Sequence, residues 1–161
     1  MALREARQVW HTLIDCSVSG VAERGGILAY TPYANGICEY ANAAAVSGQV
    51  IKAAGLLLDD VEDINYFKQP EYRQRNVVPL GSVVSIASEG EFWTDFVEQT
   101  GPGAISVGTY VPGDTLYLAD NGQVSRNNGT FNNGATAKRV VVGKALSALT
   151  SDGYLKVRIT L

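Results

Sequence analysis

Very few side chains in this sequence could serve as a general base, a nucleophile or a soft metal ligand. His11 is the only histidine among 161 residues, and Cys16 and Cys38 are the only cysteines. Cys16 follows His11 by five residues, a spacing that gives a nucleophile and its base no suitable geometry on a helix or a strand. One histidine without a Cys-x-x-Cys pair also fails to make a typical zinc site. We therefore expect a solvated His11 and no cofactor, and we favour two small buried thiols over a disulfide.

The strongest candidate for acid–base or metal chemistry is a run of four carboxylates: Asp59, Asp60, Glu62 and Asp63. Val61 stands where a calcium loop needs an oxygen ligand, so the run does not match that motif. A carboxylate pair for hydrolysis stays open, because the sequence does not give distances in space. We favour a solvated loop, since charged runs usually lie on exposed faces. Its acids are expected to face cations of this chain or of a neighbouring subunit: Lys68, Arg73 and Arg75.

Two glycine-rich segments come close to phosphate-binding loops but lack required residues. Gly129 and Gly134 have the spacing of a phosphate loop, but Ala135 stands where that loop needs a lysine. The segment 101–106 lacks the third glycine of a dinucleotide-binding turn. Together with the scarcity of histidine and cysteine, these mismatches predict that the protein is not an enzyme.

The charge balance argues against a nucleic-acid partner. Thirteen Lys and Arg against sixteen Asp and Glu leave a formal net charge of −3, whereas phosphate binding needs a basic face. No apolar run approaches the length of a membrane span, and residues 1–15 lack the compact apolar stretch of a secretory signal. The sequence thus predicts a protein made in a cytoplasm, with no membrane partner.

Short β-prone runs separated by Asn-Gly and Asp-Gly corners predict an all-β fold. Both corner residues tolerate positive φ, which favours the two-residue turns of hairpins. At this spacing the runs indicate a small β-barrel or sandwich built of short hairpin-connected strands. The expected strands are 26–30, 37–40, 80–87, 91–97, 114–118, 139–149 and 154–161.

Four of these strands are expected to form two hairpins. The last strand, 154–161, alternates aliphatic and polar residues, so its aliphatic face, with Leu161 at its end, should point inward. It pairs with 139–149. The second hairpin joins 80–87 to 91–97 through a turn at 88–90. Aromatic residues on both faces of 91–97 predict that one face is core and the other is covered by a loop or a neighbouring subunit.

Residues 1–25 are predicted to be an arm that precedes a single β domain, 26–161. Within the arm, residues 1–15 space their apolar side chains as a helix does, so they form a short amphipathic helix or an arm that orders on docking. Such a helix is too short to be stable alone. Its stripe must therefore be buried against the β domain, a neighbouring subunit or an external partner. The stripe comprises Leu3, Ala6, Val9, Trp10, Leu13 and Ile14.

Residues 59–79 combine charged and aromatic side chains with no sustained period, and long loops in compact domains tend to be functional. Aromatic residues dominate interface energetics, and arginines that face a neighbour's acids would set the register of a homo-oligomer. We expect a trimer in preference to a dimer. The candidate interface residues are Trp10, Leu13, Asp59, Asp60, Asp63, Tyr66, Phe67, Tyr72, Arg73 and Arg75.

The second half of the chain carries five short motifs in a distinctive order. They are Gly81-Ser-Val-Val, Glu89-Gly90-Glu91-Phe92, Pro112-Gly113-Asp114-Thr-Leu-Tyr117-Leu, Val142-Gly143-Lys-Ala and Asp152-Gly153-Tyr154-Leu-Lys-Val157-Arg-Ile159. In this order they resemble the small β-rich capsid decoration (cement) proteins of tailed bacteriophages. The resemblance covers residues 80–161 well and the first half loosely.

The resemblance implies a structural virion protein with no catalytic residues. It implies binding to the outside of an assembled phage capsid, with the major capsid protein as partner, and synthesis in the host cytoplasm. A protein that binds only the assembled shell stabilises it by mass action and needs neither histidine nor cysteine. The alternative from another class is a small β-barrel module that binds a ligand or glycan, with Trp93, Tyr110 and Tyr117 as a stacking platform.

Overall fold

The computed structural model describes residues 3–30, 37–40, 52–63, 77–99, 109–129 and 139–161, with the side chains of 3–15, 37, 39 and 40 left out. The described residues form strands and no α-helix, which confirms the predicted all-β class. The strands are β1 (Leu3–Val18), β2 (Ile27–Tyr30), β3 (Ile37–Tyr40), β4 (Ala53–Leu57), β5 (Asp60–Glu62), β6 (Val77–Pro79), β7 (Val83–Thr94), β8 (Thr115–Leu118), β9 (Val124–Ser125), β10 (Val141–Ala145) and β11 (Leu155–Thr160).

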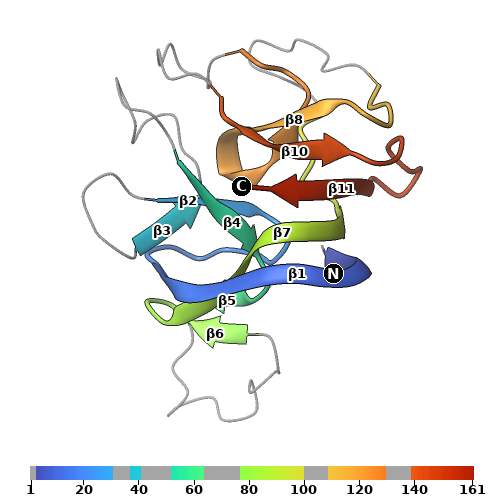
Figure 1. Ribbon diagram of the computed structural model, residues 1–161. Helices are drawn as coiled ribbons and strands as arrows, with labels where there is room; N and C mark the ends of the chain where they lie inside the picture. Colours follow the sequence, from blue (N-terminus) through green and yellow to red (C-terminus); the bar gives the residue numbers. More distant parts are fainter. Residues whose placement is uncertain (1–2, 31–36, 41–51, 64–76, 100–108, 130–138) are drawn as a thin grey trace.

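The strand pairings close into two rings that share β7 (Figure 1). The first ring runs β1-β3-β2-β4-β7 and returns to β1 because β1 also pairs with β7. The second runs β7-β11-β10-β8-β9, and β9 meets the chain just after β7 through a bridge between Val97 and Val124. Closure of this kind leaves few unpaired strand edges. The small β-barrel expected from the sequence is therefore a pair of fused, barrel-like rings.

Strand β7 has partners along both of its edges. One edge pairs with β1 from Val83 to Thr94, and the other pairs first with β4 at Ile86 and Ala87 and then with β11 from Glu89 onward. The turn predicted at 88–90 is therefore wrong, and so is the hairpin that it would close. The backbone stays extended there because Gly90 faces Ile159 of β11 and Glu89 faces Thr160.

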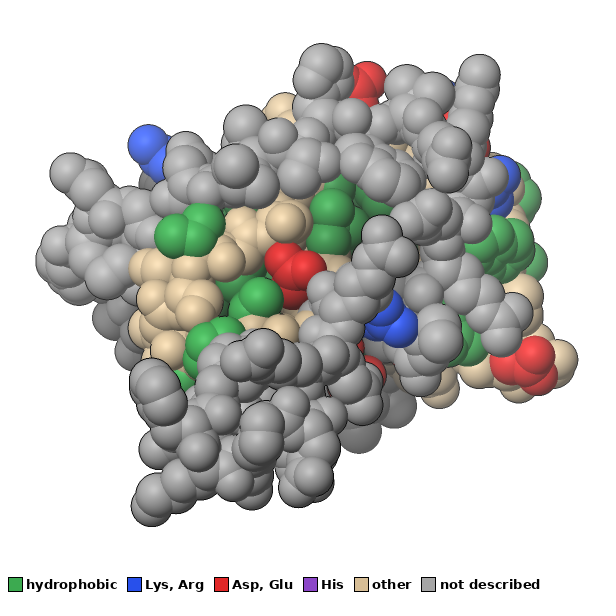
Figure 2. Space-filling model, turned by 90° about the horizontal axis from the view of Figure 1, so that it is seen from below, with side chains coloured by type: hydrophobic (Ala, Val, Ile, Leu, Met, Phe, Trp, Pro, Cys, Tyr) green, Lys and Arg blue, Asp and Glu red, His purple; other side chains and the backbone are tan. Residues whose placement is uncertain are grey.

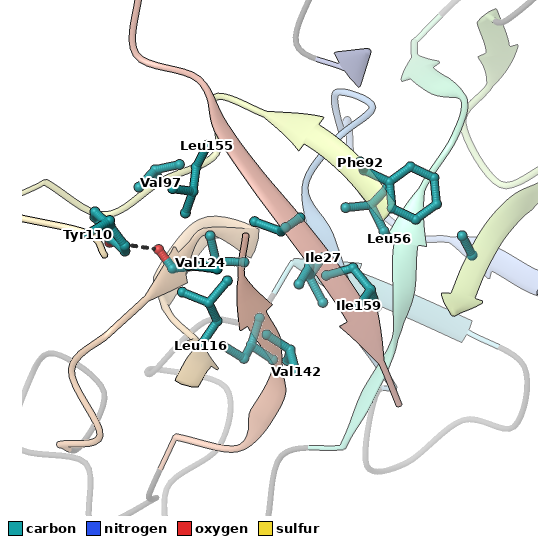
Figure 3. Close-up of a cluster of buried hydrophobic side chains, with 14 of the residues drawn as sticks. Ile27, Leu56, Phe92, Val97, Tyr110, Leu116, Val124, Val142, Leu155 and Ile159 are labelled. Carbon is teal, nitrogen blue, oxygen red and sulfur yellow. Dashed lines mark hydrogen bonds between the residues drawn. The ribbon is translucent and has the colours of Figure 1, made fainter. Parts of the chain in front are cut away.

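Two clusters of buried side chains fill the two rings. One cluster lies inside the first ring and includes Leu28, Leu57 and Ile86. The other gathers the inward faces of β8, β10 and β11 together with Leu56 and Phe92 (Figure 3). Strands β2 and β4 send successive side chains into different clusters, so both of their faces are buried. This explains why 53–57 lacks the polar alternation of a half-exposed strand and was not predicted.

The N-terminal segment is a strand, and the amphipathic helix considered for residues 1–15 is wrong. β1 pairs with β7 in a register that shifts four times. The first shift lies between Glu5 and Arg7, and the last lies between Leu13 and Cys16. Where the extra residue lies on β1, as between Leu13 and Cys16, the bulge lengthens the period-two spacing of β1 locally; between His11 and Thr12 the extra residue lies on β7 instead. A strand with repeated bulges can thus imitate the spacing of a helix. The boundary at residue 25 stays a prediction, although β1 belongs to the same sheet as the rest.

The C-terminal hairpin agrees with its predicted pattern except at its last residue. Leu155, Val157 and Ile159 are fully buried and β11 pairs with β10, as the alternation indicated. Leu161 is 45% exposed, not inward-facing. Its amide still donates to the Ser88 carbonyl oxygen at 3.1 Å, so the backbone ties the chain end to β7.

Gly143 of β10 lies directly against the backbone of β11. A Cβ atom there would clash with the Arg158 carbonyl oxygen. Gly143→Ala should therefore force the two strands apart and destabilise the fold by about 2–3 kcal/mol, lowering the Tm by roughly 5–10 °C. Gly20→Ala is the control, because a Cβ at Gly20 meets no atom within 4 Å. Equal melting temperatures of both variants would contradict this packing.

Candidate functional site

Asp59 and Asp60 of the acidic run are engaged by the chain's own backbone. The Ser85 amide donates to Asp59 Oδ2 at 2.7 Å. The Arg24 amide donates to Asp60 Oδ1 at 2.9 Å, and Arg24 Nε lies 3.8 Å from Asp60 Oδ2. These contacts fasten the start of β5 to the β1–β2 connection and to β7. The chain's own backbone and Arg24 thus contact Asp59 and Asp60, whereas the predicted partners Lys68, Arg73 and Arg75 lie outside the described residues.

The surface around β5 and β6 combines exposed acids with exposed aliphatic side chains. Glu62 and Asp63 are exposed, and Val21, Leu80 and Val83 are 64%, 41% and 58% exposed. The backbone brings them together, since Leu80 donates to the Glu62 carbonyl and Ala22 bonds with Val61. Figure 2 shows this side of the molecule, with acidic side chains set among hydrophobic and uncharged ones. We call Val21, Glu62, Asp63, Leu80 and Val83 the β5–β6 surface.

The remaining predicted interface residues divide into two groups. Trp10 and Leu13 lie on β1, where Leu13 is in register with Ile86 of β7. This pairing favours the alternative in which the N-terminal segment packs on its own β domain. Five predicted residues lie outside the described part of the chain: Tyr66, Phe67, Tyr72, Arg73 and Arg75.

The groups considered for catalysis or metal binding are His11, the two cysteines and the acidic run. No cluster of three or more His, Cys, Asp or Glu suited to a metal ion occurs among the described residues. His11 lies on β1 in register with Glu89. Cys16 and Cys38 are fully buried and carry thiols, as favoured from the sequence.

Among the described residues, the most deeply buried charges form an ion pair that the sequence did not reveal. Arg139 Nη1 and Nη2 bind Glu98 Oε2 and Oε1 at 2.5 and 2.7 Å, and the Arg139 side chain is fully buried. The Tyr110 hydroxyl donates to the Glu98 carbonyl oxygen at 2.6 Å. Burial, followed by the charge of Glu98, raises the pKa of Tyr110 well above its ordinary value, so the phenol stays protonated. The cluster therefore anchors the chain on either side of residues 100–108 and 130–138.

A second charged group lies on the outward side of β7 and β11. Arg158 Nη2 and Lys156 Nζ lie 2.6 and 3.4 Å from the two carboxylate oxygens of Glu91. The hydrogen bond from Arg158, helped by Lys156, holds the pKa of Glu91 below its ordinary value against a smaller opposing effect of burial. Two strands supply these residues: Glu91 lies on β7, and Lys156 and Arg158 lie on β11. Because the two cations are partly exposed to solvent, the group adds little stability.

The stacking platform of Trp93, Tyr110 and Tyr117 that was predicted for a glycan module is wrong. Tyr110 is 1% exposed and belongs to the hydrophobic core (Figure 3). Trp93 and Tyr117 are half-buried on strands that are not neighbours, since β11 and β10 lie between β7 and β8. The three aromatic side chains therefore cannot form one common binding surface.

The comparisons with known proteins give this chain no family. No protein-family model matches it, and no curated protein matches it. In the described part of the chain, no helix has the length and apolar character needed to cross a membrane.

Glu98→Gln tests whether the buried ion pair is structural. The change leaves the buried Arg139 guanidinium without its countercharge, and breaking such a pair costs about 3–5 kcal/mol. We expect the Tm to fall by roughly 10 °C or more. Glu91→Gln makes the same chemical change at the exposed pair and should lower the Tm far less. A Tm loss for Glu98→Gln no larger than that for Glu91→Gln, measured by calorimetry, would show that the pair does not hold the fold.

Proposed function

We propose that this protein is a non-enzymatic structural component of a phage virion, which binds the outside of the assembled capsid and stabilises it. Its partners in this role are the major capsid protein and further copies of its own chain, in a trimer. The observation that carries the proposal is where the five family-like motifs fall. All five lie on β7, β8, β10 and β11 or on the turns that lead into them.

These strands are direct neighbours in the second ring, so the motifs describe one folded unit and not scattered turns. The Gly113-Asp114 corner illustrates this. The Gly113 amide donates to the Ala145 carbonyl oxygen at 2.8 Å, and the Ala145 amide donates to the Asp114 carbonyl oxygen at 2.9 Å. The turn motif before β8 is thereby joined to the motif on β10. Because the motifs hold one another in place, they support a resemblance in fold to the capsid decoration proteins.

The β5–β6 surface supports the idea of self-association. Its aliphatic side chains are exposed beside charged ones, which is typical of surfaces that bind another protein. Each contact in an oligomer that docks at several points may be individually weak, because the copies bind by avidity. A rigid body with a surface of this kind suits a protein that joins copies to one another and to a shell.

The rival reading as a carboxylate-dependent hydrolase receives less support. Asp59 and Asp60 accept hydrogen bonds from backbone N–H groups, and Glu62 and Asp63 are exposed, so none of the four lies in the dry, enclosed environment that suits a general acid.

Co-sedimentation with phage heads tests the capsid role. Heads of the phage that encodes the chain are prepared without it and mixed with the purified protein. We expect saturable binding to the expanded heads, little binding to unassembled capsid protein, and a higher temperature of head disruption, because the ligand stabilises the state that it binds. Absence of binding to the heads, or equal binding to unassembled capsid protein, would contradict the role.

Light scattering tests the trimer. We expect a particle of three times the 17.2 kDa chain mass at micromolar concentration. Val21→Glu should dissociate it, because a charge would be buried in the contact. Val141→Glu is the matched control, since Val141 is similarly exposed, at 55%, but lies on β10 of the other ring. A monomeric wild-type protein, or the same mass for both variants, would contradict the proposed contact.

A further inference from the structure

A hollow on the outward side of the second ring brings together two aromatic rings and two polar side chains. It has a volume of about 310 Å³ and is lined by Trp93, Thr150, Asp152 and Tyr154. This volume lies at the lower end of the range for small-ligand pockets. Its lining residues belong to the end of β7 and to the turn between β10 and β11. These two segments lie on the same side of the molecule in Figure 1.

The register of β7 against β11 brings the side chains of Trp93 and Tyr154 together. Thr94 of β7 is opposite Leu155 of β11, and both are buried. Trp93 and Tyr154 precede them and so lie on the other face of the sheet. Because Trp93 is opposite Lys156, Tyr154 is its diagonal neighbour, at a distance that aromatic side chains can span. Neither aromatic side chain belongs to the core clusters, so Trp93 and Tyr154 are half-buried without contributing to the interior.

The polar side of the hollow is held by a tight turn. The Thr150 amide donates to the Tyr154 carbonyl oxygen at 2.8 Å, and the Gly153 amide donates to the Thr150 carbonyl oxygen at 3.0 Å. The Tyr154 amide donates to Thr150 Oγ1 at 2.9 Å, which leaves the hydroxyl hydrogen of Thr150 available as a donor. The Asp152 carboxylate is exposed and lines the hollow together with Trp93 and Tyr154. The turn thus offers a hydroxyl and a carboxylate in a fixed place before any ligand arrives.

We propose that this hollow binds a pyranose unit of a neutral glycan. A pyranose has an apolar C–H face that packs on an aromatic ring, and hydroxyl groups at its edge that donate to a carboxylate or bind a hydroxyl. A nucleotide fits less well, since none of the described residues that line the hollow is a cation and Asp152 would repel its phosphate. Lys156, the nearest cation in register, is engaged by Glu91. The site is independent of the capsid role, because it needs only the folded single chain.

A titration followed by NMR tests the site. The ¹⁵N-labelled protein is titrated with the methyl glycosides of glucose, galactose and N-acetylglucosamine, and with adenosine monophosphate. We expect at least one glycoside to shift the Trp93 indole signal and the amide signals of residues 150–154 in a saturable manner. Failure of all three glycosides to do so, shifts confined to other regions, or a response to the nucleotide instead would overturn the proposal.

Variants then test the roles of the side chains. Trp93→Ala should weaken glycoside binding about tenfold or more, which corresponds to the loss of one aromatic stacking partner. Asp152→Asn changes an exposed side chain whose carboxylate accepts a long hydrogen bond from the Ser151 hydroxyl at 3.4 Å, and should weaken binding severalfold. Tyr117→Ala removes an outward aromatic ring of β8 that does not line the hollow, and should leave affinity unchanged. Unchanged affinity in both Trp93→Ala and Asp152→Asn would overturn the proposal.

Discussion

Strand β7 must form hydrogen bonds along both edges and also contribute side chains to two buried clusters. The rest of the fold follows from this constraint. Other strands lie along both edges of β7, so its backbone groups need partners on both sides. β1 covers one edge, while β4 and β11 divide the other. Ile86 packs in the first ring and Phe92 in the second. Thr94 ends the strand, where its hydroxyl donates to the Gly25 carbonyl oxygen and accepts from the Phe96 amide. A break in β7 would thus open both rings.

The sequence predicted those parts of the fold in which one strand face meets solvent. Leu155, Val157 and Ile159 alternate with polar residues, and they are buried as that pattern requires. The prediction failed where both faces are buried, as at Leu56 and Leu57, because alternation then disappears. It also failed at Ser88–Gly90, whose composition is typical of a turn. Only the long-range pairing of Gly90 with Ile159 keeps that backbone extended.

The candidate sites depended even more on contacts between distant residues. The acidic run was visible in the sequence, but its partners were not: Arg24 precedes Asp60 by 36 residues, and Ser85 follows Asp59 by 26. Likewise, Glu98 and Arg139 lie 41 residues apart and look like ordinary surface charges. The sequence does point to Trp93 as a stacking residue, but it groups Trp93 with Tyr110 and Tyr117. The pairing of Trp93 with Tyr154 requires the register of β7 against β11, which the sequence does not contain.

The shared strand also determines how the outward surfaces relate to each other. The β5–β6 surface lies beside the start of β7 at Val83, whereas the hollow at Trp93 lies at its end. Ten residues of extended chain separate these points by up to roughly 30 Å. Because hydrogen bonds hold β7 on both edges, the two surfaces cannot move independently. A copy that is fixed through the β5–β6 surface therefore keeps its aromatic hollow at a set distance from that contact, where it remains accessible to a ligand.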